Sequence, residues 1–392
     1  MKITFSQKMN EFPTLIFSEL LAYKKKLQQE GKEIIDLSVG SPDLPPPDFV
    51  REELAKLVQD ETQYGYSLTG IPSFHEAVRG YYKREFQVDV DQDTEVLMVM
   101  GSQDGLVHLP LAFANPGDYI LVPDPGYTAY EAAISLAGAK PYPMALKEEN
   151  NFLPDLQTIP QDVLEKTKLM ILNFPGNPVP ALATKEFFAN VVQFANEHNI
   201  IVLHDFAYSE LYYDEKPISF LSIEGASEVG VEFNSLSKSF NMAGCRIGYV
   251  VGNETVIDGL NRLKSNLDYG VFIPIQKAAI QALTYSASFT DTLRATYKNR
   301  RDVLVEGLKS IGWDVESPKA SMFLWAKIPQ GYTSMDFAYK LLDEAGIVVT
   351  PGNAFGQEGE GYVRIALVQS ESLLLRAVDK IKESNLFSTL VK

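Results

Sequence analysis

The sequence of 392 residues has one cysteine, Cys245, and no uninterrupted apolar run long enough to span a bilayer. A single cysteine cannot form an intrachain disulfide, which excludes a disulfide-stabilised secreted scaffold. The first ten residues also lack the apolar core of a signal peptide. We therefore expect a soluble, cytoplasmic protein.

The sequence also lacks an excess of positive charge. Lys and Arg number 35 against 51 Asp and Glu, which gives a net charge of −16. This acidic balance argues against nonspecific binding to nucleic acid or to an anionic membrane. It leaves room for a local anion site, because one or two buried arginines act at short range. We expect small-molecule partners, and the sequence gives no indication of a metal site.

One stretch, residues 234–249, carries the most specific chemistry. Lys238 lies among three serines and precedes Arg246, between two apolar runs at 229–233 and 247–251 that are typical of buried strands. Desolvation lowers the pKa of a lysine and frees its amine to attack a carbonyl. Nearby hydroxyls and an arginine suit a phosphate. Together they indicate pyridoxal 5'-phosphate held as a Schiff base. The alternative is an ordinary solvated lysine, since Ser-x-x-Lys is common.

Short apolar runs alternate with helical patterns before this stretch. The runs lie at 95–100, 119–122, 168–172 and 200–203. This alternation predicts a mostly parallel sheet with helices on both faces. Ligands of such sheets bind at the carboxyl ends of the strands. The polar residues that follow strand ends, and so converge on one edge, are Ser102, Tyr127, Asn177, Asp205 and Lys238.

The pattern of predicted secondary structure changes after Asn253. A long helical stretch at about 253–310 precedes apolar runs at 321–328 and 362–367. We predict an N-terminal arm and part of a small domain over 1–45. A large cofactor-binding domain is expected over 46–275 and a small α+β domain over 276–392.

Several single residues allow two interpretations. Asp205 could hold a proton on a pyridine nitrogen, or cap a helix N-terminus. Tyr208 and Asn177 could donate to the cofactor's phenolic oxygen, and Tyr127 could stack on its ring or pack in the core. Arg364 lies in an apolar strand, where an unpaired charge is costly. Its partner could be a substrate carboxylate or a structural ion pair.

Taken in order, these motifs resemble the class I/II pyridoxal-phosphate-dependent aminotransferases, over about 34–367. The resemblance implies an α/β, fold-type I architecture of the aspartate-aminotransferase kind, with a mostly parallel seven-stranded sheet and a smaller α+β domain. It implies that Lys238 forms the Schiff base and that Arg246 binds the phosphate. Asp205 would pair with the pyridinium nitrogen and Tyr208 with the phenolate.

The resemblance assigns roles to further residues. Ser102, Gln103, Ser235 and Ser237 would bind the phosphate. Tyr127 would stack on the ring, and Asn177 would contact the phenolic oxygen. Gly40, Asn177 and Arg364 would bind the substrate: Arg364 would hold its α-carboxylate, and the Gly40 backbone would lie near that group. Tyr64 would reach the phosphate of a neighbouring subunit, which implies a homodimer.

The sequence departs from the family pattern at two places. The usual Asn-Pro-Thr-Gly is Asn177-Pro-Val-Pro180, and Cys245 replaces a common tryptophan. Both departures could reshape the pocket. Among subgroups the motifs look most like LL-diaminopimelate aminotransferases.

The expected activity is transfer of an amino group between an L-amino acid and a 2-oxo acid. The candidate substrates are LL-diaminopimelate, or a related amino acid, with 2-oxoglutarate. A carbon–sulfur β-lyase of the cystathionine lyase type, using the same lysine, is an alternative. A more remote alternative is a non-enzymatic cofactor-sensing regulator, although the stretch before Ile34 is not expected to hold a DNA-binding domain.

Overall fold

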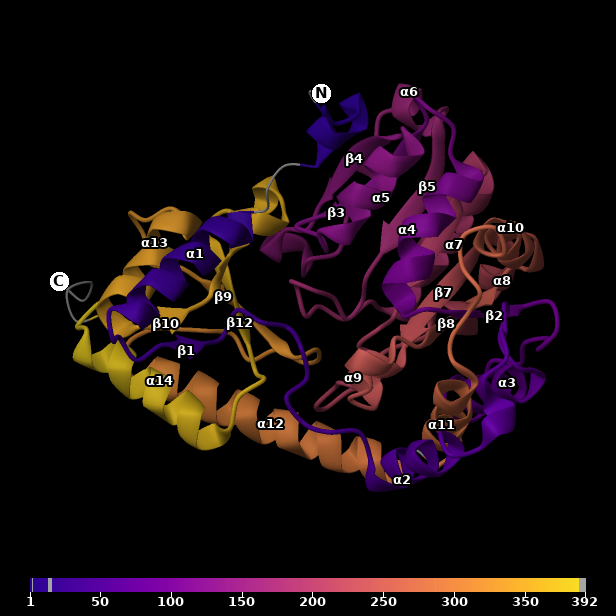
Figure 1. The fold of residues 1–392 in the computed structure, drawn as a ribbon. Coiled ribbons are helices and arrows are strands. Elements are labelled where there is room, and N and C mark those ends of the chain that lie inside the picture. The colour runs from indigo at the N-terminus through magenta and orange to yellow at the C-terminus, as the bar shows by residue number, and fades with distance from the viewer. Residues whose placement is uncertain (2, 13–15, 286, 388–392) are drawn as a thin grey trace.

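The computed structural model describes residues 1, 3–12, 16–285 and 287–387 (Figure 1). A large unit is built on a seven-stranded sheet, and a smaller unit holds a three-stranded sheet and a two-stranded pair. Across these ranges, we find no helix of the length and apolar character needed to cross a membrane.

The large sheet has the strand order β2-β8-β7-β6-β5-β3-β4. Among its described strands, β8 alone runs antiparallel to its neighbours. The mostly parallel seven-stranded sheet expected from the sequence is therefore confirmed. In chain order the strands are β2 (Val96–Val99), β3 (Tyr119–Asp124), β4 (Lys140–Ala145), β5 (Thr167–Leu172), β6 (Ile201–Asp205), β7 (Gly230–Ser235) and β8 (Gly248–Gly252).

Helices cover both faces of this sheet because side chains alternate along each strand. On β6, Val202 packs with the core beneath α3 (Pro72–Phe86) and α7 (Lys185–His198). Its neighbour Leu203 packs with the opposite core. That second core is covered by α4 (Ser102–Phe113), α5 (Ala129–Ala137) and α10 (Glu254–Lys264). The remaining helices of the large unit are α2 (Asp48–Leu57), α6 (Gln161–Leu164), α8 (Ala226–Val229), α9 (Leu236–Ser239) and α11 (Ile273–Thr284).

The smaller unit joins the two ends of the chain. Its antiparallel sheet has the order β11 (Thr350–Pro351), β12 (Tyr362–Ala366), β9 (Phe323–Lys327). Strand β1 (Ile35–Asp36) pairs in parallel with β10 (Ile347–Val348), which brings the N-terminal segment into this unit. The helices are α1 (Ile16–Gln29), α12 (Ala287–Ser310), α13 (Ser334–Lys340), which continues as a π-helical turn over Leu341–Ala345, and α14 (Glu371–Glu383). The domain boundaries given above remain predictions.

The long helical stretch expected at about 253–310 is divided into three helices, α10, α11 and α12. Gly270 causes part of the break. It has φ +82°, and its backbone forms an isolated bridge with Ser67. A Cβ there would lie 1.7 Å from the Ser67 carbonyl oxygen, so only glycine allows this approach.

Candidate active site

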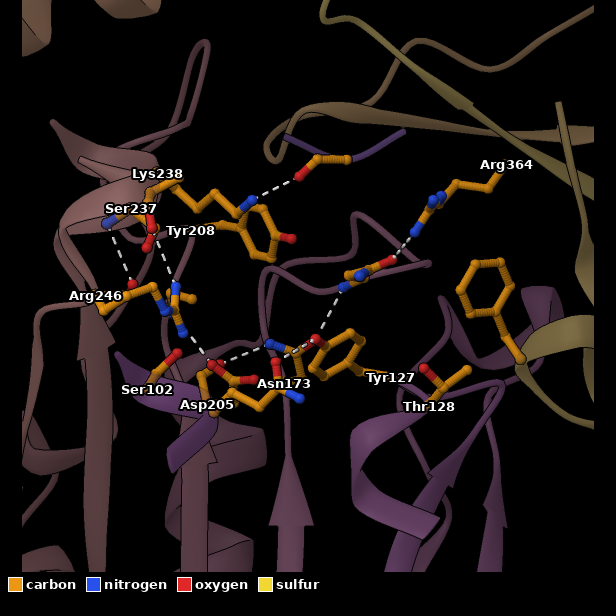
Figure 2. A pocket seen from close by; sticks show the side chains of 17 residues that line it. Ser102, Tyr127, Thr128, Asn173, Asp205, Tyr208, Ser237, Lys238, Arg246 and Arg364 are labelled. Atoms are coloured by element: carbon orange, nitrogen blue, oxygen red, sulfur yellow. Dashed lines mark hydrogen bonds between the residues drawn. The ribbon is translucent and has the colours of Figure 1, made fainter. Parts of the chain in front are cut away.

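A cavity of about 370 Å³ opens at the carboxyl ends of the parallel strands (Figure 2). Both units contribute to it, because β12 of the smaller unit supplies Arg364 and the large sheet supplies Asp205. The structure places every sequence-predicted site residue on this cavity except Tyr64. Those residues are Gly40, Ser102, Gln103, Tyr127, Asn177, Asp205, Tyr208, Ser235, Ser237, Lys238, Arg246 and Arg364.

Lys238 reaches the cavity from the short helix α9, which begins where β7 ends. The Ser235 hydroxyl caps this helix by accepting from the Ser237 amide at 3.2 Å. The Lys238 ammonium donates to the Gly40 carbonyl oxygen at 2.6 Å (Figure 2). Burial, helped by the positive charge of Arg364, lowers the pKa of Lys238 from 10.5 to about 8. Its amine therefore becomes a nucleophile far more readily than that of a surface lysine.

Asp205 ends β6 and lies buried at the floor of the cavity. Its carboxylate accepts from the Tyr130 hydroxyl at 2.7 Å and from the Ala207 amide at 3.3 Å. Burial raises the pKa of the Asp205 carboxyl, and these hydrogen bonds oppose that rise. Residues 207–210 form turns and no helix follows β6 directly, so Asp205 caps no helix. One of its two sequence interpretations is thereby excluded.

An anion-binding cradle lies beside Lys238. Helix α4 begins at Ser102, and its free backbone N–H groups and positive dipole end favour an anion. The Arg246 guanidinium reaches the same place, donating to the Met100 carbonyl at 3.4 Å and the Ala243 carbonyl at 3.1 Å. A Cβ on Gly101, whose φ is +80°, would lie 2.6 Å from Arg246 Nη2. Glycine is needed there for the arginine to approach.

Arg364 faces the cavity from the side opposite Lys238 (Figure 2). It donates to Asn177 Oδ1 and to the Ser38 carbonyl, both at 2.6 Å, and lies over the rings of Phe323 and Phe355. Burial lowers its pKa from 12.5 to about 10, so it stays charged at neutral pH. Its Nε is buried without a partner. Its hydrogen-bond partners among the described residues are neutral oxygens, which leaves its charge suited to a carboxylate from outside the chain.

Two tyrosines complete the wall. Burial raises the pKa of Tyr208, so its hydroxyl stays protonated and can donate a hydrogen bond. The Tyr127 hydroxyl contacts Gln103 Oε1 at 3.2 Å, and its ring packs edge-on against Tyr130. Burial also raises the pKa of Tyr127.

Tyr64 lies away from the cavity of its own chain. Its side chain is largely exposed, its hydroxyl donates to the Val58 carbonyl at 2.9 Å, and its ring packs against Phe272. The predicted role of Tyr64 therefore requires a second chain.

Sequence reasoning missed several residues at the cavity. Asn173 accepts from the Asn177 amide at 2.9 Å and donates to the Asp205 carbonyl at 2.7 Å. It directly follows the apolar run 168–172, so the signal that selected the other strand-end residues could have found it. Tyr130, which contacts Asp205, lies in the first turn of α5 and 75 positions before Asp205, so no local signal marked it. Thr128, Ala207, Ala243 and Phe355 also line the cavity.

The donor set fits pyridoxal 5'-phosphate. Lys238 offers an amine to an aldehyde carbon, and the buried Asp205 carboxylate suits a protonated ring nitrogen. The start of α4 and Arg246 form the cradle for a phosphate. All of these groups line the same cavity.

Comparison with known sequences places this site in context. The family described as "Aminotransferase class I and II" matches residues 32–381. The LL-diaminopimelate aminotransferase of Halothermothrix orenii is 42% identical, covering 97% of this chain and 98% of the relative. The enzyme of the same name from Aquifex aeolicus is 44% identical, covering 97% and 99%.

Solved structures agree in fold. A substrate-bound BacF from Bacillus subtilis superposes with a TM-score of 0.94 at 40% identity, over 98% of each chain. An aspartate aminotransferase double mutant from Thermus thermophilus superposes with a TM-score of 0.91 at 26% identity, over 98% of this chain and 100% of the other.

Proposed function

The chain belongs to the class I and II aminotransferases, pyridoxal-phosphate-dependent enzymes, and we propose that its amino donor is LL-diaminopimelate and its acceptor 2-oxoglutarate. Relatives of that name match nearly the whole chain at 42% to 45% identity. The observation that carries the assignment is the shared cavity, which is lined by both Lys238 and the buried Arg364.

Residues that line the cavity bind and orient the substrate and the cofactor. Arg364 grips the α-carboxylate of the substrate with its planar fork, and Asn177 holds that fork in place. The backbone at Gly40 closes the cavity beside them. Arg246 and the start of α4 bind the cofactor phosphate, together with Gln103 and the hydroxyls of Ser102, Ser235 and Ser237.

Proton transfer falls to Lys238 and Asp205. When bound, the cofactor supplies an aldehyde carbon for amines and a ring that accepts electrons from the substrate α-carbon. Lys238 would act as the base that takes the proton from that carbon and as the acid that returns it, because burial lowers the pKa of its amine to about 8. Asp205 would keep a proton on the ring nitrogen, and the protonated Tyr208 hydroxyl would donate to the phenolic oxygen. Tyr127 would stack on the ring.

We also infer a homodimer in which Tyr64 completes the phosphate site of the neighbouring subunit. An exposed aromatic group supports this inference: Tyr64 packs on Phe272 and Tyr66 packs on Tyr269, with ring centroids 5.2 Å and 5.0 Å apart. Clustered exposed aromatics mark an association surface.

Half-reactions with single amino acids test the proposed function. The yellow holoenzyme is mixed with LL-diaminopimelate, its DD isomer, glutamate, alanine, phenylalanine or cystathionine, and the visible spectrum is followed. We expect bleaching fastest with the LL isomer, reversed by 2-oxoglutarate, and none in Lys238→Ala. The DD isomer controls for stereochemistry.

Two results would contradict the proposal. An LL-diaminopimelate rate no higher than that of alanine would refute the substrate. Release of ammonia and pyruvate from cystathionine, with the yellow colour kept, would favour the β-lyase.

A further inference from the structure

His204 precedes Asp205 on β6, and its side chain points to the opposite face of the sheet. Alternation places it with Val202, in the core beneath α3 and α7, whereas Asp205 faces the cavity. His204 is fully buried, at 0% exposure, among the rings of Phe188 and Phe206. A buried polar ring at this place needs hydrogen-bond partners.

Both ring nitrogens of His204 face acceptor oxygens. Nδ1 lies 2.9 Å from Glu232 Oε2, and Nε2 lies 3.1 Å from the carbonyl oxygen of Phe174. A backbone carbonyl can only accept, so Nε2 carries a hydrogen. The proton between Nδ1 and Glu232 Oε2 belongs either to the imidazole ring or to the carboxyl group.

Three other groups donate hydrogen bonds to the Glu232 carboxylate. The Tyr82 hydroxyl donates at 2.8 Å, the Ser219 hydroxyl at 2.9 Å and the Phe220 amide at 2.8 Å. Hydrogen bonds to the charged form favour it. Glu232, itself at 0% exposure, is therefore the anion and the His204 ring the cation. A buried charge pair of this kind requires such additional hydrogen bonds.

The same histidine touches the active-site turn. Its Nε2 holds the Phe174 carbonyl, while the adjacent Asn173 donates to the Asp205 carbonyl and accepts from the Asn177 amide. The turn that carries Asn177 is thus tied to β6 on both sides.

We propose that His204 is a positioning residue: a buried imidazolium, paired with Glu232, that keeps Asp205 ionised and anchors the turn carrying Asn177. This inference rests on the proposed function, in which Asp205 keeps a proton on the cofactor ring nitrogen.

Asp205 is influenced by a second cation, His204, in addition to Lys238. Two cations, His204 and Lys238, lower the pKa of its carboxyl against the rise caused by burial. Tyr130 on α5 donates to it, and Tyr127 and Tyr208 also face it. In the proposed function the amine of Lys238 gains and loses a proton, so its charge changes. His204 lies on the opposite face of the sheet and outside the cavity, so its charge stays constant.

On the other face of the sheet, His204 meets Glu232 of β7, with Tyr82 of α3 behind that carboxylate. In the strand register Glu232 lies opposite His204, whereas Asp205 lies opposite Phe233. His204 is among the charges that lower the pKa of the Asp205 carboxyl.

Nitrogen-15 NMR of the histidine side chains in the cofactor-free protein is the first test. The His204 signals are assigned by their loss in His204→Gln. We expect both ring nitrogens to carry a hydrogen, as their two acceptor partners require. An unprotonated Nδ1 would overturn the inference, and this measurement on the wild type stands even if the variant does not fold.

The second test uses cofactor labelled with nitrogen-15 in its ring. Glutamine at position 204 can still donate to the Phe174 carbonyl but carries no charge. In His204→Gln we expect the ring nitrogen to lose its proton at neutral pH. We also expect kcat to fall by roughly 10-fold, the effect of about one pKa unit, with KM changed less than about twofold. His75→Gln, which alters a partly buried histidine bonded to the Thr69 carbonyl outside the cavity, is the control.

The two measurements distinguish the role of His204 from the proposed role of Asp205. A ring nitrogen protonated in both wild type and His204→Gln would refute the role of His204 and leave that of Asp205 standing. An unprotonated ring nitrogen in the wild type would refute the proposed role of Asp205 and, with it, this inference. A lower melting temperature alone, with unchanged ring protonation, would show that His204 serves only stability.

Discussion

At the scale of single residues, burial determines the chemistry of Lys238. The folded protein holds this amine at a pKa of about 8 against 10.5 when unfolded, chiefly through desolvation. The folded state therefore binds protons less readily than the unfolded state. Stability is lost as pH falls from the unfolded value through the folded value, and below about 8 the full cost is present.

Replacing Lys238 should consequently stabilise the cofactor-free protein. We expect Lys238→Met to raise the free energy of unfolding by about 1–2 kcal/mol near pH 7, and this gain should vanish as pH approaches about 11. Urea unfolding across this pH range measures it. Lys185→Met, at an exposed position, is the control without such a gain. A pH-independent difference for Lys238→Met would mean that its burial does not act through charge.

Arg364 offers a second prediction at this scale. Lysine in its place keeps the charge but loses the planar fork, so two parallel hydrogen bonds to a carboxylate become impossible. We expect Arg364→Lys to raise KM for the amino acid by roughly 10- to 100-fold while the cofactor spectrum stays unchanged. Steady-state kinetics measure this, and an amino acid amide, which lacks the carboxylate, is the matched control substrate. An equal loss with the amide would contradict the assignment.

Single residues also show where sequence reasoning reaches its limit. The residues after strand ends could be found, because apolar runs bury as strands and parallel strands end at one edge. Tyr130 on Asp205 and the Gly40 carbonyl on Lys238 could not, since they join segments 75 and 198 positions apart. Tyr64 was selected by resemblance alone, and the fold of one chain leaves it outside the cavity.

At the scale of elements, the turn that begins α4 depends on Gly101. Its φ of +80° disfavours any side chain, and a Cβ there would also meet Arg246. Gly117 has a similar φ of +95° but open space around it. Comparing alanine variants at Gly101 and Gly117 therefore distinguishes the cost of backbone strain from the displacement of Arg246.

We expect both alanine variants to lose about 1 kcal/mol of stability through the positive φ alone. Only Gly101→Ala should also weaken cofactor binding, by roughly 10-fold, because the arginine must move. Equilibrium titration of the cofactor-free variants with pyridoxal 5'-phosphate measures this. Equal affinities in the two variants would remove Gly101 and Arg246 from the proposed phosphate site.

The apolar runs predicted the central strands of the large sheet, but no strand was predicted at the position of β4. Its sequence, Lys140–Ala145, contains Pro141 and Pro143, which argue against a central strand. The structure resolves the conflict by placing β4 at the edge of the sheet. Similarly, nothing local marked the break at Gly270, because the close approach to Ser67 arises only in the folded chain.

At the scale of the whole molecule, the exposed aromatic group of Tyr64, Tyr66, Tyr269 and Phe272 predicts association. We expect the double variant Tyr66→Asp and Tyr269→Asp to be monomeric in analytical ultracentrifugation and to lose most of its activity, because two buried charges disfavour the contact. Leu375→Asp changes an exposed apolar residue on α14 and is the control that should remain dimeric. A double variant that keeps the wild-type mass would place the interface elsewhere.

The pairing of β1 with β10 has a consequence for synthesis on the ribosome. The strands of the large sheet all lie between Val96 and Gly252, so this sheet can assemble while the rest of the chain is still being made. The smaller unit must wait, since Ile35 finds its partner Ile347 only after 312 further residues have emerged. Until then β1 stays unpaired, and Arg364 is the last of the cavity-lining residues to be synthesised. The nascent protein thus builds its lysine-bearing half before it can recognise a carboxylate.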